Sequence, residues 1–276
     1  MSVTPTASVQ SLPAQIYAGP NSELMVKRGA LILGDTGAQF FSGIQRYAVE
    51  GSDFTGGGQA YSTTVVDGWR SRKGSDGACV DWTVTPAISG SVVGTIGSTT
   101  ASMAVSGVQL DRGLCWRASQ GDLVFEARVK LSAITNIACF IGFTDQTAAL
   151  EMPIQSAASA DTFTTNATDA VGFMFDTSMT TDTWWLAGVA NDVDATQQNS
   201  AAVPVAATYQ TFRIELTTAG VATFYIDGTQ VGTAAGLSGA VTASVLLTPV
   251  IAGFNRTTTG TPTITADYVY TSGGRV

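Results

Sequence analysis

The sequence predicts an all-β protein in which two antiparallel sheets pack face to face as a sandwich. Charged residues make up only 12% of the 276 residues and hydrophobic residues 45%, and the many small and β-branched residues suit sheets better than long helices. From residue 122 onward, apolar and polar residues alternate at the period of half-buried strands. Gly, Asn, Asp and Thr residues separate these segments, and about ten strands joined in this way favour two sheets.

The alternation is clearest over residues 123–131, where the apolar residues share one face of the expected strand and the charged residues share the other. Shorter apolar segments follow at 138–143, 171–175 and 184–189, each too short and too rich in glycine for a helix. The last strands are expected at 247–254 and 263–270. The predicted core is drawn from these segments and the meander at 211–231: Phe125, Val129, Phe173, Phe175, Phe212, Ile214, Leu216, Phe224 and Ile226.

A three-stranded antiparallel meander is expected between residues 211 and 231. A Thr-Ala-Gly turn joins the strands 211–216 and 222–226, and Asp227-Gly228 leads into a third strand at 229–231. Asp-Gly can supply the two positive φ angles of a type I′ turn, whose twist matches the flanking strands.

The first part of the chain lacks this periodicity. Pro5, Pro13, Pro20 and the glycines 56–58 interrupt every apolar run there. We therefore expect residues 1–64 to form an extended, irregular arm that is ordered by partners, and residues 65–276 to form the sandwich.

The charge balance excludes some partners. A net charge of −8 and a pI near 4.4 disfavour nucleic acid, which attracts clustered Lys and Arg. The one basic cluster, Arg70, Arg72 and Lys73, stands beside Asp67 and Asp76 and is interpreted as a solvated turn. Apolar runs are much shorter than the roughly 20 residues of a membrane helix. Neither nucleic acid nor membrane is expected as a partner.

The sequence has no histidine, which excludes Ser-His-Asp and Cys-His nucleophiles and imidazole metal ligands. Cys79, Cys115 and Cys139 are odd in number and lack C-x-x-C spacing. Neither a full disulfide framework nor a cysteine zinc site is predicted, and buried thiols are the preferred interpretation.

Carboxylates give no recognisable catalytic motif. Asp35-Thr36-Gly37 has the form in which aspartic proteases present one of their two catalytic carboxylates, but the sequence has no second triplet, and a turn is favoured. A retaining glycosidase needs two carboxylates about 5 Å apart. The glutamates lie far apart in sequence, although distant residues can converge in space. We therefore assign no catalytic, cofactor-binding or metal-binding residue and expect that the chain is not an enzyme. The glutamates in question are Glu23, Glu50, Glu126, Glu151 and Glu215.

Two segments have side chains suited to a ligand. Residues 191–194 (Asn-Asp-Val-Asp), with Gln197, Gln198 and Asn199 downstream, offer the oxygen ligands that calcium prefers, but they lack the glycine and glutamate of an EF-hand, and a polar loop is favoured. Trp184-Trp185 could stack on a sugar. Neighbouring strand positions point to opposite faces, so at most one ring is expected in the core, and core or interface packing is favoured.

The stretch from Phe212 to Gly232, with its Tyr-Ile-Asp-Gly-Thr-Gln-Val-Gly hairpin, resembles the concanavalin A-like (laminin G-like) jelly rolls. A longer stretch is similar to virion structural proteins of tailed bacteriophages. It runs from Phe140-Ile-Gly-Phe-Thr-Asp through 169–177 and Trp184-Trp185 to the closing segment 264–270, which is roughly the last 140 residues of the chain.

This resemblance implies a jelly-roll sandwich on the outer capsid surface of a virion, as a decoration, cement or fibre-type protein. The implied partners are the major capsid protein and further copies of the chain; a homotrimer would fit the local three-fold sites of a capsid lattice. The start of the sequence lacks a basic and apolar signal segment, so synthesis in the bacterial host cytoplasm is expected. The alternative is a carbohydrate-binding, lectin-like module of a phage fibre or surface protein that binds surface glycans.

Overall fold

The computed structural model describes residues 24–27, 30–33, 38–40, 47–52, 54, 65–66, 68–85, 90–156 and 161–274. The chain divides into two units, residues 1–49 with 274–276 and residues 50–273. In the first unit, three short strands form an antiparallel sheet in the order β1-β2-β3. These strands lie within residues 1–64, for which an irregular arm was expected. The ordering of this arm by a partner stays a prediction. They are β1 (Leu24–Lys27), β2 (Ala30–Leu33) and β3 (Ala38–Phe40).

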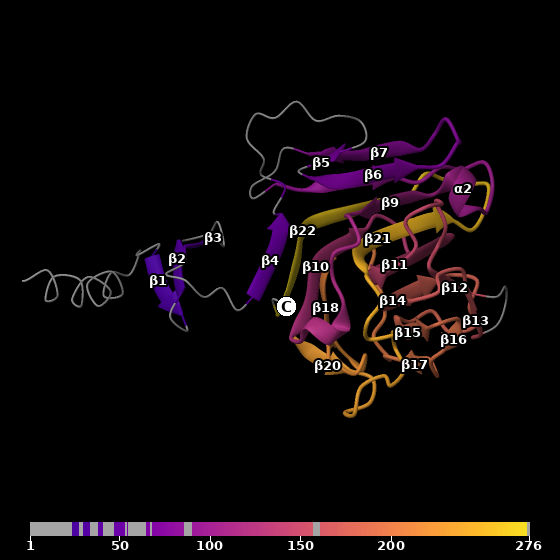
Figure 1. Cartoon of the computed structure of the whole chain (residues 1–276). Helices are drawn as coiled ribbons and strands as arrows, with labels where there is room; N and C mark the ends of the chain where they lie inside the picture. The colour runs from indigo at the N-terminus through magenta and orange to yellow at the C-terminus, as the bar shows by residue number, and fades with distance from the viewer. Residues whose placement is uncertain are drawn as a thin grey trace, which may run out of the picture. The chain divides into compact units, whose positions relative to one another are not determined.

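The second unit contains two large antiparallel sheets, which confirms the predicted sandwich (Figure 1). The nine-stranded sheet has the order β16-β15-β14-β11-β21-β9-β6-β5, and β17 also pairs with β15. Its strands are β5 (Val65–Val66), β6 (Trp69–Lys73), β9 (Val108–Asp111), β11 (Ile137–Thr144), β14 (Ala170–Asp176), β15 (Trp185–Ala190), β16 (Val193–Asp194), β17 (Gln198–Asn199) and β21 (Thr248–Asn255).

The eight-stranded sheet has the order β20-β19-β18-β10-β22-β8-β7, and β4 also pairs with β22. Asp227 and Gly228, which join β19 to β20, have φ angles of 50° and 78°, as a type I′ turn requires. The strands of this sheet are β4 (Tyr47–Ser52), β7 (Val80–Val84), β8 (Val92–Thr95), β10 (Leu123–Leu131), β18 (Tyr209–Leu216), β19 (Ala222–Ile226), β20 (Thr229–Val231) and β22 (Thr263–Gly274).

Aromatic residues fill the space between the two sheets. Phe125 of β10 meets Phe143 of β11 edge to face, with ring centroids 5.5 Å apart. Phe173 of β14 makes the same kind of contact with Phe212 and Phe224, each at 5.1 Å. Every residue of the predicted core is buried, so the strand phase inferred from the alternation is confirmed.

The outer face of the central strands β11, β14 and β21 is also buried, because residues 145–156 and 161–169 cover it. We call these residues the covering segment. Phe140, Met174 and Val250 point away from the other sheet and join one apolar cluster. Met152 and Ile154 of the covering segment complete this cluster. The segment includes the hairpin of β12 (Ile154–Ser156) and β13 (Phe163–Thr165), which lies beside β14 and β15 (Figure 1). The short helix α2 (Met103–Ser106) adds Met103 to the cluster.

Two expectations from the sequence are wrong at the level of the fold. The basic cluster lies in strand β6 and not in a solvated turn; its residues are Arg70, Arg72 and Lys73. Strand β6 pairs with β9, and residues 69–73 alone give no sign of this distant partner. Cys115 is exposed, whereas Cys79 and Cys139 are buried as expected. Within the described ranges, no helix is long and apolar enough to cross a membrane.

Candidate functional site

The calcium candidate at residues 191–194 is exposed and consists of a two-residue turn and strand β16. Asn191 and Asp192 have φ angles of 51° and 62° and connect β15 to β16. The backbone N–H of Asn191 donates to Asp169 at 3.3 Å. In the part of the chain that the structure describes, no group of three or more His, Cys, Asp or Glu residues could hold a metal ion. The Asp35-Thr36-Gly37 triplet lies outside the described residues.

Both tryptophans of the Trp184-Trp185 pair are buried, so the expectation that at most one ring would lie in the core is wrong. Trp184 lies between the sheets, 4.6 Å from Phe212 between ring centroids, and its Nε1–H donates to Gln210 at 3.1 Å. Trp185 points to the outer face, where Phe163 of the covering segment packs edge to face on it at 5.9 Å. Neither ring is available to stack on a sugar.

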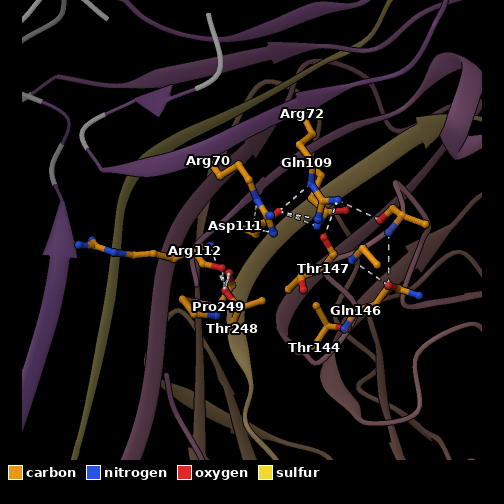
Figure 2. A network of polar contacts seen from close by, with 12 residues as sticks. Arg70, Arg72, Gln109, Asp111, Arg112, Thr144, Gln146, Thr147, Thr248 and Pro249 are labelled. Carbon is orange, nitrogen blue, oxygen red and sulfur yellow. Dashed lines mark hydrogen bonds and ion pairs between the residues drawn. The ribbon is translucent and has the colours of Figure 1, made fainter. Parts of the chain in front are cut away.

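A network of polar side chains centres on Asp111 at the end of β9 (Figure 2). Asp111 is fully buried and lies opposite Arg70 in the β6–β9 register. Arg70 donates to Oδ1 at 2.8 and 2.5 Å, and Arg72 donates to Oδ2 at 3.1 and 2.8 Å. Gln109 donates to the same Oδ2 at 2.8 Å. The carboxylate therefore accepts charge-assisted hydrogen bonds from two sides, as a buried charge requires.

The Asp111 network holds the covering segment on the sheet. Nη1 of Arg72 donates to the backbone carbonyls of Thr147 and Ala149, each at 3.1 Å. Gln146 stabilises the same turn, because its N–H donates to Thr144 at 3.0 Å and its side-chain oxygen accepts from the N–H of Ala148 at 3.2 Å (Figure 2). This network is therefore an anchor for the chain's own segment.

A pair of aspartates, Asp145 and Asp169, lies where β11 ends and β14 begins. The backbone N–H of Asp145 donates to the carbonyl of Asp169 at 2.9 Å. Burial raises the pKa of Asp145, and the negative charge of Asp169 raises it further. The Asp169 carboxylate accepts backbone N–H groups of Thr242 and Asn191 at 2.5 and 3.3 Å and is buried. This pair fixes loops at the end of the sandwich.

Two glutamates that lie far apart in sequence converge on the outer face of the eight-stranded sheet. The β10–β18 register places Glu126 opposite Arg213, with Glu215 two positions further along β18. Arg213 donates to Glu215 at 2.8 and 2.5 Å and to Glu126 at 3.4 Å. Tyr268 donates to Glu126 at 2.7 Å and Tyr225 to Glu215 at 3.5 Å.

These side chains belong to a row that crosses four neighbouring strands. Tyr225 of β19 pairs with Arg213 of β18, Arg213 with Glu126 of β10, and Glu126 with Tyr270 of β22. Directly paired residues of antiparallel strands share a face. We call Tyr225, Arg213, Glu126 and Tyr270 the Arg213 row. Tyr270 is exposed and the other three members are half-buried, with 41% of the Arg213 side chain, 27% of the Glu126 side chain and 37% of Tyr270 exposed.

The surroundings of the Arg213 row keep two hydrogen-bond donors protonated, Arg213 and its neighbour Tyr268. Burial would lower the pKa of Arg213, but hydrogen bonds and charges from Glu215 and Glu126 raise it overall. Partial burial raises the pKa of Tyr268, and its hydrogen bond to Glu126 raises it further. Together with Tyr268 and Glu215, the row therefore presents a guanidinium, a phenol donor and two carboxylate acceptors.

The sequence could have indicated this row only in part. The pattern Phe212-Arg213-Ile214-Glu215-Leu216 shows that Arg213 and Glu215 leave the core. That β10 joins this meander, and in which register, depends on a pairing between residues 87 positions apart. Glu126 and Arg213 become neighbours only through that pairing. Glu151 does not join them, because it lies on the covering segment beside Gln146. Glu23 lies outside the described residues.

No protein-family model matches the chain, and no curated protein matches it either. Solved structures do match. A protein of unknown function from Shewanella oneidensis MR-1 is 10% identical over 99% of this chain and 95% of its own length, with a TM-score of 0.52. A β-glucanase from Bacillus licheniformis is 14% identical over 81% of this chain and 97% of its own, also at 0.52. An endo-acting O-glycanase of the human gut microbiota, described in connection with mucin breakdown, is 8% identical over 80% and 97%, at 0.51.

At these identities, the likeness shows a shared concanavalin A-like jelly-roll sandwich. It also contradicts the expectation that the chain is not an enzyme, because the β-glucanase and the O-glycanase carry out catalysis on this fold. Without a recognisable linear motif, two carboxylates can still be brought together by strand pairing, as Glu126 and Glu215 are here.

Proposed function

We propose that the chain is a carbohydrate-binding, lectin-like protein and that the Arg213 row is its binding surface. The observation that carries this proposal is the arrangement of Tyr225, Arg213, Glu126 and Tyr270 in one partly exposed line across four strands. The outer face of the other sheet is covered by the chain itself. In the described part of the chain, the row side chains on the outer face of the eight-stranded sheet stay partly exposed, so this face can receive a ligand.

The chemistry of the row suits a sugar. A sugar ring has an apolar C–H face, which packs on an aromatic ring, and hydroxyl groups at its edge, which need donors and acceptors. Tyr225 and Tyr270 supply the rings. Arg213 and Glu126 supply a planar donor fork and a carboxylate acceptor between them. Matching structures named as a β-glucanase and an O-glycanase agree with a carbohydrate ligand.

A glycan microarray tests the proposal with the full chain and two matched arginine variants. The unaltered protein should bind a subset of glycans, and Arg213→Ala should lose that binding. Arg70→Ala is the control, because the Arg70 side chain is equally exposed at 42% but lies on the other sheet. Release of reducing ends from each bound glycan, measured in parallel, reports whether binding leads to cleavage. The proposal fails if no glycan binds, or if Arg70→Ala and not Arg213→Ala removes binding.

For the location of the chain, we propose the outer capsid surface of a tailed-phage virion, with the major capsid protein and further copies of the chain, as a homotrimer, for partners. The sequence resemblance of the last part of the chain supports this assignment, and a surface position would give the Arg213 row access to host glycans. Mass spectrometry of purified particles should find the chain in a fixed ratio to the major capsid protein. Deletion of residues 1–30 should remove it from particles, and unchanged incorporation would contradict the proposed attachment.

A further inference from the structure

The charges around the Arg213 row are already paired with one another. Arg213 pairs with Glu215 at 2.5 Å and with Glu126 at 3.4 Å. Beside the row, Arg128 pairs with Asp267 at 2.5 Å. The face therefore has hydrogen-bonding groups without an excess of positive charge, and it belongs to a chain with a net charge of −8. An anionic sugar would have to compete with these carboxylates for the guanidinium groups.

The remaining cation near the row, Lys130, lies over an aromatic ring. Its Nζ is 4.7 Å from the ring centroid of Tyr209, and the guanidinium carbon of Arg128 is 4.4 Å from the same centroid. The Tyr209 ring is thus occupied by the protein's own cations. Tyr225 and Tyr270, the two tyrosines of the row, have no such cation among the described contacts, so a ligand can stack on their rings.

The rings of Tyr225 and Tyr270 belong to strands that lie three strand spacings apart. Neighbouring strands lie about 4.8 Å apart, which places the Cα atoms of Tyr225 and Tyr270 roughly 14 Å from each other. A single sugar contacts one ring, whereas an extended chain that lies across the strands contacts both. Arg213 and Glu126 lie between the rings, where the middle of such a chain would present its hydroxyl groups.

We infer that the ligand of the Arg213 row is an uncharged, extended glycan chain that runs perpendicular to the strands and stacks on Tyr225 and Tyr270 at once. This inference rests on the proposed function and specifies its ligand. It consists of two separate predictions: the ligand is uncharged, and both tyrosine rings contribute to binding.

Affinity electrophoresis tests the charge of the ligand. The full chain migrates through gels that each contain one soluble polysaccharide. The neutral probes are barley β-glucan, xyloglucan, galactomannan and soluble starch; the acidic probes are alginate, polygalacturonate and hyaluronan. We expect at least one neutral polysaccharide and none of the acidic ones to retard the protein. Added salt should leave the retardation unchanged, because neutral ligands do not depend on ion pairing.

Tyrosine variants test the two-ring geometry. Tyr225→Ala and Tyr270→Ala should each lower the affinity about tenfold, whereas Tyr270→Phe, which keeps the ring, should change it less than about threefold. Tyr209→Ala is the matched control and should bind like the unaltered protein, because that ring is already occupied. Circular dichroism and thermal unfolding confirm that each variant is folded.

The outcomes separate this inference from the proposed function. Retardation by acidic polysaccharides alone, with loss in Arg213→Ala, would overturn the neutral ligand and leave carbohydrate binding intact. Loss of binding in only one of the two row variants would overturn the two-ring geometry. An absence of retardation by every polysaccharide, together with an empty microarray, would overturn both.

Discussion

At the scale of single residues, Phe212 tests the packing between the sheets. Its side chain is 1% exposed and contacts the rings of Phe173 and Trp184. Phe212→Ala should lower the free energy of unfolding by about 3 to 5 kcal/mol, because it leaves a cavity lined by rigid aromatic residues. Denaturant titration followed by circular dichroism measures this change. A loss below about 1 kcal/mol would contradict full burial of this strand face.

Asp76 gives the fold a dependence on pH. Its carboxylate accepts backbone N–H groups of Ala78, Ser98 and Thr99, and these hydrogen bonds hold its pKa well below the ordinary value of 3.8. A lowered pKa in the folded state contributes stability above pH 3.8, and this stability is lost as the pH falls further.

Asp76→Asn should therefore unfold more easily than the unaltered chain at pH 7. The difference should shrink as the pH falls below 3.8, because Asp76 then takes up a proton in the unfolded chain and folding must remove that proton. Thermal unfolding of both proteins from pH 7 to pH 2 checks this expectation. A difference that stays constant over that range would show that the charge of the Asp76 carboxylate does not contribute to its hydrogen bonds with Ala78, Ser98 and Thr99.

At the scale of elements, Arg72 connects β6 to the covering segment. It donates to buried Asp111 and to the carbonyls of Thr147 and Ala149. Arg72→Ala should cost about 2 to 4 kcal/mol, since it removes one partner of a buried charge. It should also accelerate amide exchange in residues 145–156.

Arg70→Ala is the control for that experiment. Arg70 also pairs with Asp111, but no described hydrogen bond joins its side chain to the covering segment, and it is more exposed. We expect a smaller loss of stability and unchanged exchange in residues 145–156. Equal exchange in the two variants would mean that Arg72 does not anchor the segment.

The elements also explain which features could be predicted from the sequence. Alternation over residues 123–131 and the Asp227-Gly228 turn are local signals, and both are confirmed. The partner of Arg70 is 41 residues away and that of Glu126 is 87 residues away, so a window of neighbouring residues could not reveal them. Burial of Trp185 depends on Phe163 in a separate hairpin. The sequence therefore predicted the sheets but not their outer faces, where both polar networks lie.

At the scale of the whole molecule, the two units should differ in stability. The described strands of the first unit are only three or four residues long, and a sheet this small buries little apolar surface. Limited trypsin digestion should cut first after Lys27, Arg28 or Arg46. A fragment that contains the sandwich should remain, with its β-type circular dichroism unchanged. Equal resistance of both units would contradict this order of stability, and digestion in denaturant provides the control that all sites can be cut.

The central claim is that the outer face of the eight-stranded sheet binds an extended glycan. A crystal structure of the full chain with the glycan selected on the microarray tests it most directly. The ligand should lie across β19, β18, β10 and β22, stacked on Tyr225 and Tyr270 and hydrogen-bonded to Arg213 and Glu126. A glycan bound instead on the nine-stranded sheet, beside the Asp111 network or the covering segment, would contradict the account.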